Sequence, residues 1–111
     1  MINWTKLKKR IPSKVIIGNN TYEILFIDEF SSPSTLGETR LEDKQIILKN
    51  GQTPKELVKT YLHECLHAVS EEFEVGLTEQ QILKMEEAIS FILKDGNVFR
   101  KGKKWAKKYL F

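Results

Sequence analysis

The sequence predicts a single small α+β domain, in which a sheet of two hairpins is followed by two helices. Three observations predict this class. The chain has 111 residues, 41% of them hydrophobic, which is enough for one core and too little for two. Residues 14–49 contain short apolar and β-branched runs separated by turn residues. Residues 54–95 instead repeat their apolar side chains at helical spacing.

The first half of the chain is expected to form a sheet of two hairpins. The expected strands are Lys14–Ile17, Tyr22–Ile27, Leu36–Leu41 and Gln45–Lys49. The first pair flanks Gly18-Asn19-Asn20 and the second flanks Glu42-Asp43-Lys44, and both segments are typical of turns. The sheet is therefore expected to be antiparallel or mixed. Residues 28–35, which contain serine and proline, are expected to be a loop.

A long helix is expected from Pro54 to about Glu74. Thr53 can cap it, Pro54 suits the first helical position, and Glu56 completes a capping box with Thr53. Gly76 is expected to end it. The apolar side chains recur at helical spacing. They are Leu57, Val58, Tyr61, Leu62, Cys65, Leu66, Val69 and Phe73.

A second amphipathic helix is expected to continue to about Asp95. Thr78 and Gln81 form another capping box, and Gly96 is a typical stop. Its apolar stripe follows the helical period. The stripe consists of Ile82, Met85, Ile89, Ile92 and Leu93. The two capped helices are expected to form a hairpin through Gly76.

The only two histidines of the chain, His63 and His67, lie four residues apart with Glu64 between them. On a helix this spacing places both imidazoles on one face, where they can bind the same metal ion. Glu64 lies a quarter-turn away, in the position of a general base for hydrolysis. The alternative is that an amphipathic helix carries two histidines by chance. The uncharged flanking residues favour the metal site.

A hydrolytic zinc site usually has three protein ligands, so a third is needed. Cys65 is adjacent, but its side chain is expected to point to the far side of the helix as a small buried group. Glu71 continues the row of the two histidines. Eight residues of helix rise about 12 Å, which is too far for one ion to hold both Glu71 and His63. Glu71 is expected to hydrogen-bond near His67 or to face solvent.

Glu86, on the second helix, is the preferred third ligand. On a helical wheel it lies within the apolar stripe, whereas Glu87 lies with the lysines of the opposite face. A carboxylate in an apolar stripe needs a partner, and a metal ion on the facing helix would supply one. Glu87 is the second choice, and Glu86 at the edge of the stripe without a ligand role is the plain alternative. Glu79 lies on a similar face, but the helix dipole already explains an acidic first turn.

The motif with uncharged flanks, a glutamate on the next helix and a β-rich lead-in resemble the compact gluzincin-type zinc metallopeptidases. The resemblance is strongest to the short ones encoded by phages and conjugative elements, and it covers about residues 15–95. It implies a zincin-like domain in which His63, His67 and Glu86 hold Zn²⁺ and Glu64 activates a zinc-bound water.

The resemblance also implies a substrate site. The chain departs from the family pattern in two features. In such enzymes a strand bordering the cleft pairs with an extended substrate, and Leu36–Leu41 is the expected strand here. A strand that only covers the core is an equally good interpretation. The chain has no firmly placed Tyr, His or Arg for the oxyanion, and no glycine follows the motif as some zincin families require. The efficiency of catalysis is the property that these departures affect.

Charge is unevenly distributed along the chain. Residues 94–111 carry +6, whereas the whole chain carries only +3. Residues 1–96 are expected to form the domain, and residues 97–111 a basic aromatic tail that packs on it or extends from it. The tail could also contact an acidic surface or nucleic acid. One cysteine, no membrane-spanning apolar run and no signal peptide predict a cytoplasmic protein, in a bacterial host or encoded by a phage.

Two classes of function follow from these observations. The first is a zinc peptidase that hydrolyses a peptide bond in one protein target, with Glu64 as the base. The second is a non-catalytic binding module of a phage or mobile element, in which zinc stabilises the helix hairpin and the basic tail engages a protein or nucleic acid. The presence of Glu64 favours the enzyme, since a structural zinc site does not need this carboxylate.

Overall fold

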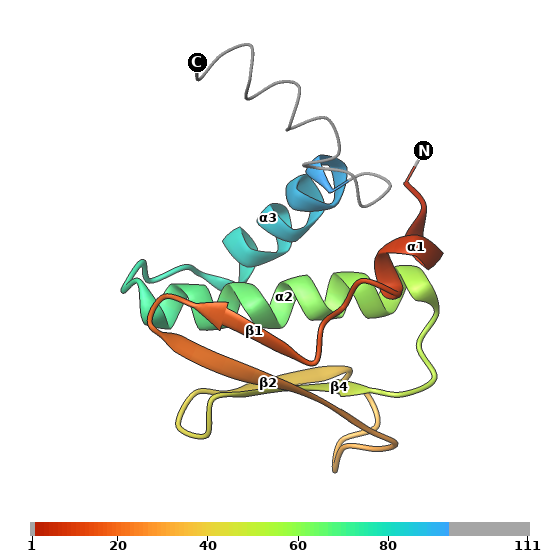
Figure 1. Ribbon diagram of the computed structural model, residues 1–111, viewed down its shortest axis with the longest axis horizontal. Helices are drawn as coiled ribbons and strands as arrows, with labels where there is room; N and C mark the ends of the chain where they lie inside the picture. Colours follow the sequence, from red (N-terminus) through yellow and green to blue (C-terminus); the bar gives the residue numbers. More distant parts are fainter. Residues whose placement is uncertain (1, 94–111) are drawn as a thin grey trace.

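The protein folds into three layers: a four-stranded sheet, a long central helix, and a third helix on the outer side of the central one (Figure 1). The computed structural model describes residues 2–93. The elements are α1 (Trp4–Lys8), β1 (Lys14–Ile17), β2 (Asn20–Ile27), β3 (Gly37–Arg40), β4 (Gln45–Lys49), α2 (Pro54–Glu72) and α3 (Glu79–Ile92). The α+β class predicted from the sequence is confirmed.

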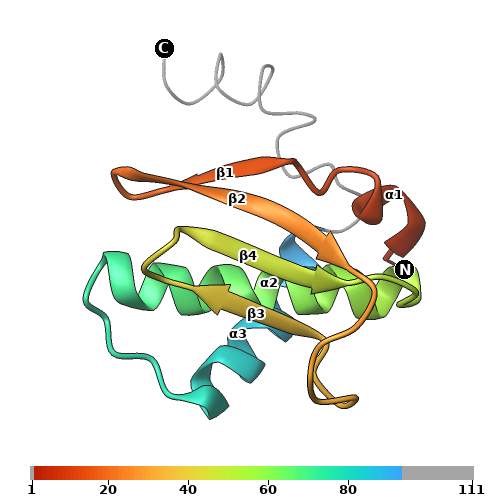
Figure 2. The ribbon, with the colours of Figure 1, turned by 90° about the horizontal axis from the view of Figure 1, so that it is seen from below.

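The sheet is mixed and has the strand order β1-β2-β4-β3. Both expected hairpins are present as antiparallel pairs, β1 with β2 and β3 with β4. The hairpins join through a parallel pairing of β2 with β4, which runs from Glu23↔Gln45 to Ile27↔Lys49. This arrangement leaves β3 at one edge of the sheet. Figure 2 shows β4 and β3 lying over α2. The edge strand β3 therefore lies beside the helix that carries the two histidines.

Two apolar clusters hold the layers together. The larger lies between the sheet and α2. It consists of Ile17, Tyr22, Ile24, Ile46, Leu48, Leu57 and Ala68. The smaller contains Leu7 of α1 with Val58 and Leu62 of α2, and Leu93 packs against it. α2 therefore contributes to both clusters and is covered on more than one side, which explains the uncharged residues around the histidine motif.

Both expected helix starts are confirmed as capping boxes. The side chain of Thr53 accepts a hydrogen bond from the backbone N–H of Glu56, and the carboxylate of Glu56 accepts one from the backbone N–H of Thr53. The second box is formed in the same way by Thr78 and Gln81. Each box satisfies two backbone donors that the first turn of a helix leaves free. The two starts fix where α2 and α3 begin relative to the sheet.

The end of α2 differs from the expected one. The helix stops at Glu72 rather than near Glu74, because Glu74 adopts the left-handed conformation with φ 52°. The N–H of Val75 then donates to the carbonyl of Ser70 over 3.0 Å. Gly76 is also left-handed, with φ 69°, but it lies in the connection rather than at the cap. A left-handed glutamate is uncommon, so the sequence pointed to the glycine instead.

Other boundaries differ by a few residues, and one helix was not predicted. β2 begins at Asn20 and β3 covers only Gly37–Arg40, so both turns fall slightly away from their predicted places. α1 has too few residues for a helical period, although Asn3 caps it and Leu7 is buried. α3 ends at Ile92, a little before the predicted end near Asp95. The domain boundary at residue 96 and the basic tail lie outside the described residues. In residues 2–93 no helix is long and apolar enough to cross a membrane.

Candidate metal centre

His63 and His67 face each other on the side of α2 that is turned toward α3. Their Nε2 atoms are 3.3 Å apart and their ring centroids 4.9 Å apart. The imidazoles therefore converge as the four-residue spacing predicts. The side chain of His63 is 16% exposed and that of His67 is 37% exposed, so the pair lies at the wall of an open site rather than in the core.

The carboxylate of Glu79, in the first turn of α3, lies against both imidazoles. One oxygen is 2.6 Å from Nε2 of His63 and the other is 3.2 Å from Nε2 of His67. One ligand atom from each of the three residues lies within 4.8 Å of the others. Ligand atoms bound to a tetrahedral zinc ion at about 2.0–2.1 Å are about 3.3 Å apart. The spacing of these nitrogen and oxygen atoms thus suits a small divalent cation.

Glu86 contacts the other nitrogen of His63. Its carboxylate oxygen lies 3.4 Å from Nδ1, and the residue is 7% exposed. A carboxylate at Nδ1 favours a proton on that nitrogen and leaves the lone pair of Nε2 pointing at Glu79. A lone pair facing a carboxylate requires a proton or a metal cation between them. The contact of Glu86 with His63 therefore favours the tautomer that a metal ligand needs.

Glu64 is buried beside the histidines, and a residue of the sheet holds its carboxylate in place. The hydroxyl of Thr39 on β3 lies 2.8 Å from a carboxylate oxygen of Glu64 and 2.9 Å from its backbone carbonyl, so it can donate to either. Burial raises the pKa of Glu64, while the hydrogen bond from Thr39 and the neighbouring imidazoles act in the opposite direction. The carboxylate is thus fixed through one oxygen on the same helix as the histidines.

Gly37 lets the edge strand approach α2 closely at this point. A Cβ atom at this position would lie 2.6 Å from Cγ2 of Thr60 and 3.0 Å from Cγ of Glu64. The same atom would lie 3.4 Å from the second carboxylate oxygen of Glu64. Any side chain at position 37 would therefore clash with Thr60 and Glu64 of α2. The absence of one leaves space beside the free oxygen of Glu64.

Two hollows flank this contact along the boundary between β3 and α2. The first, of about 410 Å³, lies beside the loop that precedes β3 and reaches His63, Glu64 and Glu86. The second, of about 470 Å³, lies beside β3 and reaches Glu64 and His67. Gly37 and Glu64 line both hollows. A molecule bound along the edge of the sheet would therefore pass over the carboxylate.

The second-choice and rejected residues lie away from the histidine nitrogens. Glu87 is exposed and forms an ion pair with Lys59 over 2.6 Å. Cys65 packs against the core between α2 and the sheet, as expected, and burial raises the pKa of its thiol to about 12. Glu71 is exposed at the second hollow. The burial of Glu86 is confirmed, and its role as a direct ligand stays a prediction.

Sequence reasoning gave Glu79 no role beyond the helix dipole. One signal pointed to it, because Glu79 and Glu86 are seven residues apart and so share a face of the helix. What the sequence lacks is the angle at which α3 crosses α2. That angle brings Glu79, in the first turn of α3, to the Nε2 atoms of both histidines. It brings Glu86, two turns later, to Nδ1 of His63.

Comparisons of the chain with known protein families, with curated proteins and with solved structures found no match.

Proposed function

We propose that the protein is a zinc-dependent peptidase that hydrolyses a peptide bond in a protein target. The observation that carries the proposal is the group formed by His63, His67 and Glu79, with the buried carboxylate of Glu64 beside it. Two imidazoles and one carboxylate are a common ligand set of catalytic zinc, which keeps a further position for water or substrate. In this proposal the domain is zincin-like.

We assign different roles to Glu79 and Glu86 of α3. Glu79 is the third ligand, since its oxygens lie 2.6 and 3.2 Å from the two Nε2 atoms. Glu86, which the sequence favoured as the ligand, instead orients His63 through Nδ1. A bound zinc ion would polarise the scissile carbonyl and make a neighbouring water more acidic.

Glu64 acts as the general base in the proposed reaction. It has one oxygen held by Thr39 and a second that faces the space above Gly37. The second oxygen can accept the proton of the attacking water and later give it to the leaving amine. Thr39 prevents the carboxylate from rotating away. Burying a carboxylate that has a single side-chain donor costs free energy, and a catalytic role for Glu64 would account for that cost.

The substrate is proposed to bind in extended form along β3. This strand is at the edge of the sheet, so its outer backbone groups have no strand partner within the described residues. Strand addition there would carry a peptide across both hollows and over Glu64. The hollows would then receive side chains on either side of the scissile bond.

A second function, a zinc-stabilised binding module, is supported by a different observation. The three proposed ligands connect α2 to the first turn of α3, so a metal ion would also fasten α3 to the rest of the domain. In this alternative the chain engages a partner through its basic tail and needs no catalytic base. The buried, hydrogen-bonded Glu64 has no role in it, which is why we favour the peptidase.

The ligand assignment is tested by measuring zinc in purified variants. The wild-type chain should retain one zinc, and the His63→Ala/His67→Ala variant should retain none. Glu86→Ala should weaken zinc binding about 10–100-fold, as the loss of an orienting partner does, and Glu79→Ala should weaken it further. Competition with a chelating indicator gives both affinities. Glu87→Ala is the matched control on the solvent side of α3 and should have no effect.

Each outcome has a distinct meaning. A larger loss for Glu86→Ala than for Glu79→Ala would return the ligand role to Glu86. Full zinc in the double histidine variant would refute the metal site. Zinc-loaded protein that cleaves nothing in a broad peptide library would favour the binding module.

A further inference from the structure

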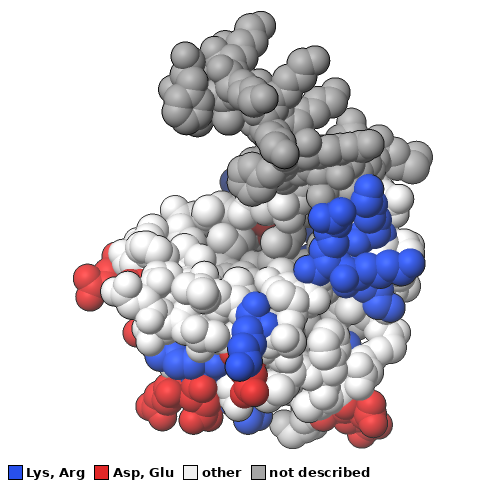
Figure 3. Space-filling model, viewed as in Figure 1, with Lys and Arg blue, Asp and Glu red and all other residues white. Residues whose placement is uncertain are grey.

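A second charged feature lies at the end of the molecule near α1. Four basic residues lie on this short helix or directly after it: Lys6, Lys8, Lys9 and Arg10. Figure 3 shows Lys and Arg side chains gathered in this region. Lys55 of α2 joins them, with its Nζ 5.9 Å from the ring centre of Trp4. We call these five side chains the α1 basic surface. None of them is a proposed zinc ligand.

The α1 basic surface forms no direct ion pair with a carboxylate among the described residues. Residues 2–14 contain five basic and no acidic residues, a charge of +5. Within residues 2–93 the ion pairs of basic side chains with carboxylates involve Arg40, Lys44, Lys59 and the histidines, and no member of the surface. Residues 15–93 carry −8, so the net charge of +3 conceals a strongly polarised chain. Such polarisation favours a polyanionic partner at this end.

The way α1 packs indicates which polyanion fits. A helix that binds a membrane surface presents an apolar face to the lipid and places its basic residues around it. In α1 the apolar residue Leu7 is 6% exposed and faces Val58 and Leu62 of α2. What α1 presents outward is mainly Lys8, Lys9 and Arg10, all exposed. The outward side of α1 thus carries charge without an apolar stripe, which suits the phosphates of a nucleic acid better than a bilayer.

We propose that the α1 basic surface binds the phosphate backbone of nucleic acid. The contact is made to phosphates rather than to bases, so it should depend strongly on salt and little on sequence. The proposal is independent of the metal site. It would hold a peptidase, or a binding module, close to proteins that are themselves bound to nucleic acid.

The test uses the full-length chain and a labelled DNA duplex of about 20 base pairs. The Lys8→Gln/Arg10→Gln variant removes two exposed charges of the surface. The matched control, Arg40→Gln/Lys84→Gln, also removes one Lys and one Arg, from β3 and α3. At about 50 mM salt the first variant should bind about tenfold more weakly than wild type, and its slope of log K against log salt should fall by about 1 to 2. The control should bind within about twofold of wild type.

Equal weakening in both variants would overturn the proposal, since only net charge would then matter. Wild-type protein that fails to bind the duplex would also overturn it. Anionic vesicles containing phosphatidylserine provide the second arm. Binding to vesicles that requires Lys8 and Arg10, with none to DNA, would assign the surface to a membrane and refute the nucleic-acid contact. Circular dichroism of each variant checks that its fold is retained.

Discussion

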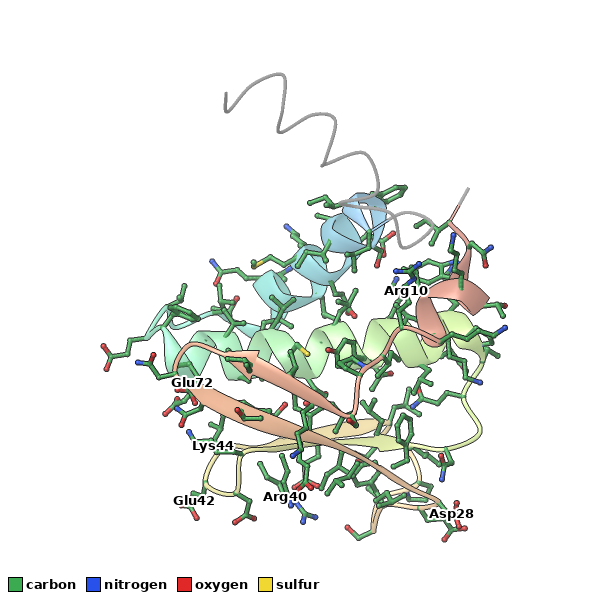
Figure 4. All side chains as sticks on the ribbon, viewed as in Figure 1. Arg10, Asp28, Arg40, Glu42, Lys44 and Glu72 are labelled. Atoms are coloured by element: carbon green, nitrogen blue, oxygen red, sulfur yellow. The ribbon has the colours of Figure 1, made fainter. Side chains whose placement is uncertain are left out.

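Glu64 and Glu72 lie on the same helix, but their carboxylates have opposite surroundings. Glu72, at the end of α2, accepts hydrogen bonds from Asn20 and Tyr22 over 2.6 Å and pairs with Lys44 over 2.8 Å. Figure 4 shows Glu72 and Lys44 close together at the end of the helix farthest from Arg10. Glu64 has one side-chain donor, Thr39.

The difference appears in the acidity of the two groups. Hydrogen bonds from Lys44, Tyr22 and Asn20 lower the pKa of Glu72 to about 2. Burial raises the pKa of Glu64. A carboxylate saturated by donors is a weak base and joins elements of the fold. A buried carboxylate with one free oxygen is a stronger base and can take part in proton transfer. The number of donors around each carboxylate thus fits a structural role for Glu72 and the proposed catalytic role of Glu64.

Replacing each carboxylate by its amide gives the largest expected contrast. Glu64→Gln keeps the shape of the side chain but cannot accept a proton, so peptide hydrolysis should fall by about a hundredfold to ten-thousandfold. Glu72→Gln should retain the activity. Cleavage products from a peptide library, analysed by mass spectrometry at equal zinc content, measure both. Equal losses in the two variants would contradict the distinct role of Glu64.

The close approach at Gly37 gives the next effect. Gly37→Ala should lower the free energy of unfolding by about 1–3 kcal/mol, because the new Cβ meets Thr60 and Glu64. Thr60→Ser removes the Cγ2 atom that lies 2.6 Å from the new Cβ and keeps the hydroxyl. The Gly37→Ala/Thr60→Ser double variant should therefore regain part of the loss. Urea denaturation of all four chains completes the cycle, and strictly additive effects would argue against the contact.

The pH dependence of stability tests the other carboxylate. The pKa of Glu72 in the folded chain is about 2, below its ordinary value of 4.5. Its contribution to stability is therefore present above pH 4.5 and is lost as the pH falls through about 2. The urea midpoint of wild type should fall over this window more than that of Glu72→Gln. Parallel curves for the two proteins would show that Glu72 has an unshifted pKa.

Much of the fold could be predicted because its signals are local. The capping boxes at Thr53 and Thr78 depend on residues three positions apart, and both are confirmed. The turn residues placed both hairpins. The parallel pairing of β2 with β4 was not specified, because a turn sequence determines the partner within a hairpin but not the order of two hairpins. The left-handed Glu74 was missed because the conformation depends on the chain around it.

The candidate site divides in the same way. The convergence of His63 and His67 follows from the helical period, and the buried side of α3 follows from its apolar stripe. The contacts of Glu79, Thr39 and Gly37 depend on how α3 and β3 sit against α2. They are long-range contacts, and no pattern along the chain determines the distance between two elements.

The contact of β3 with Glu64 also determines how relatives of this chain should be sought. A histidine-glutamate motif alone is short and occurs by chance in unrelated helices. Here it is joined to Gly37 and Thr39, two positions of an edge strand that precede it, and to Glu79 and Glu86, which follow it on one face of α3. A search pattern that requires the small residue, the hydroxyl and both carboxylates at these spacings would select chains that can assemble the centre, even where the sequence between them has diverged.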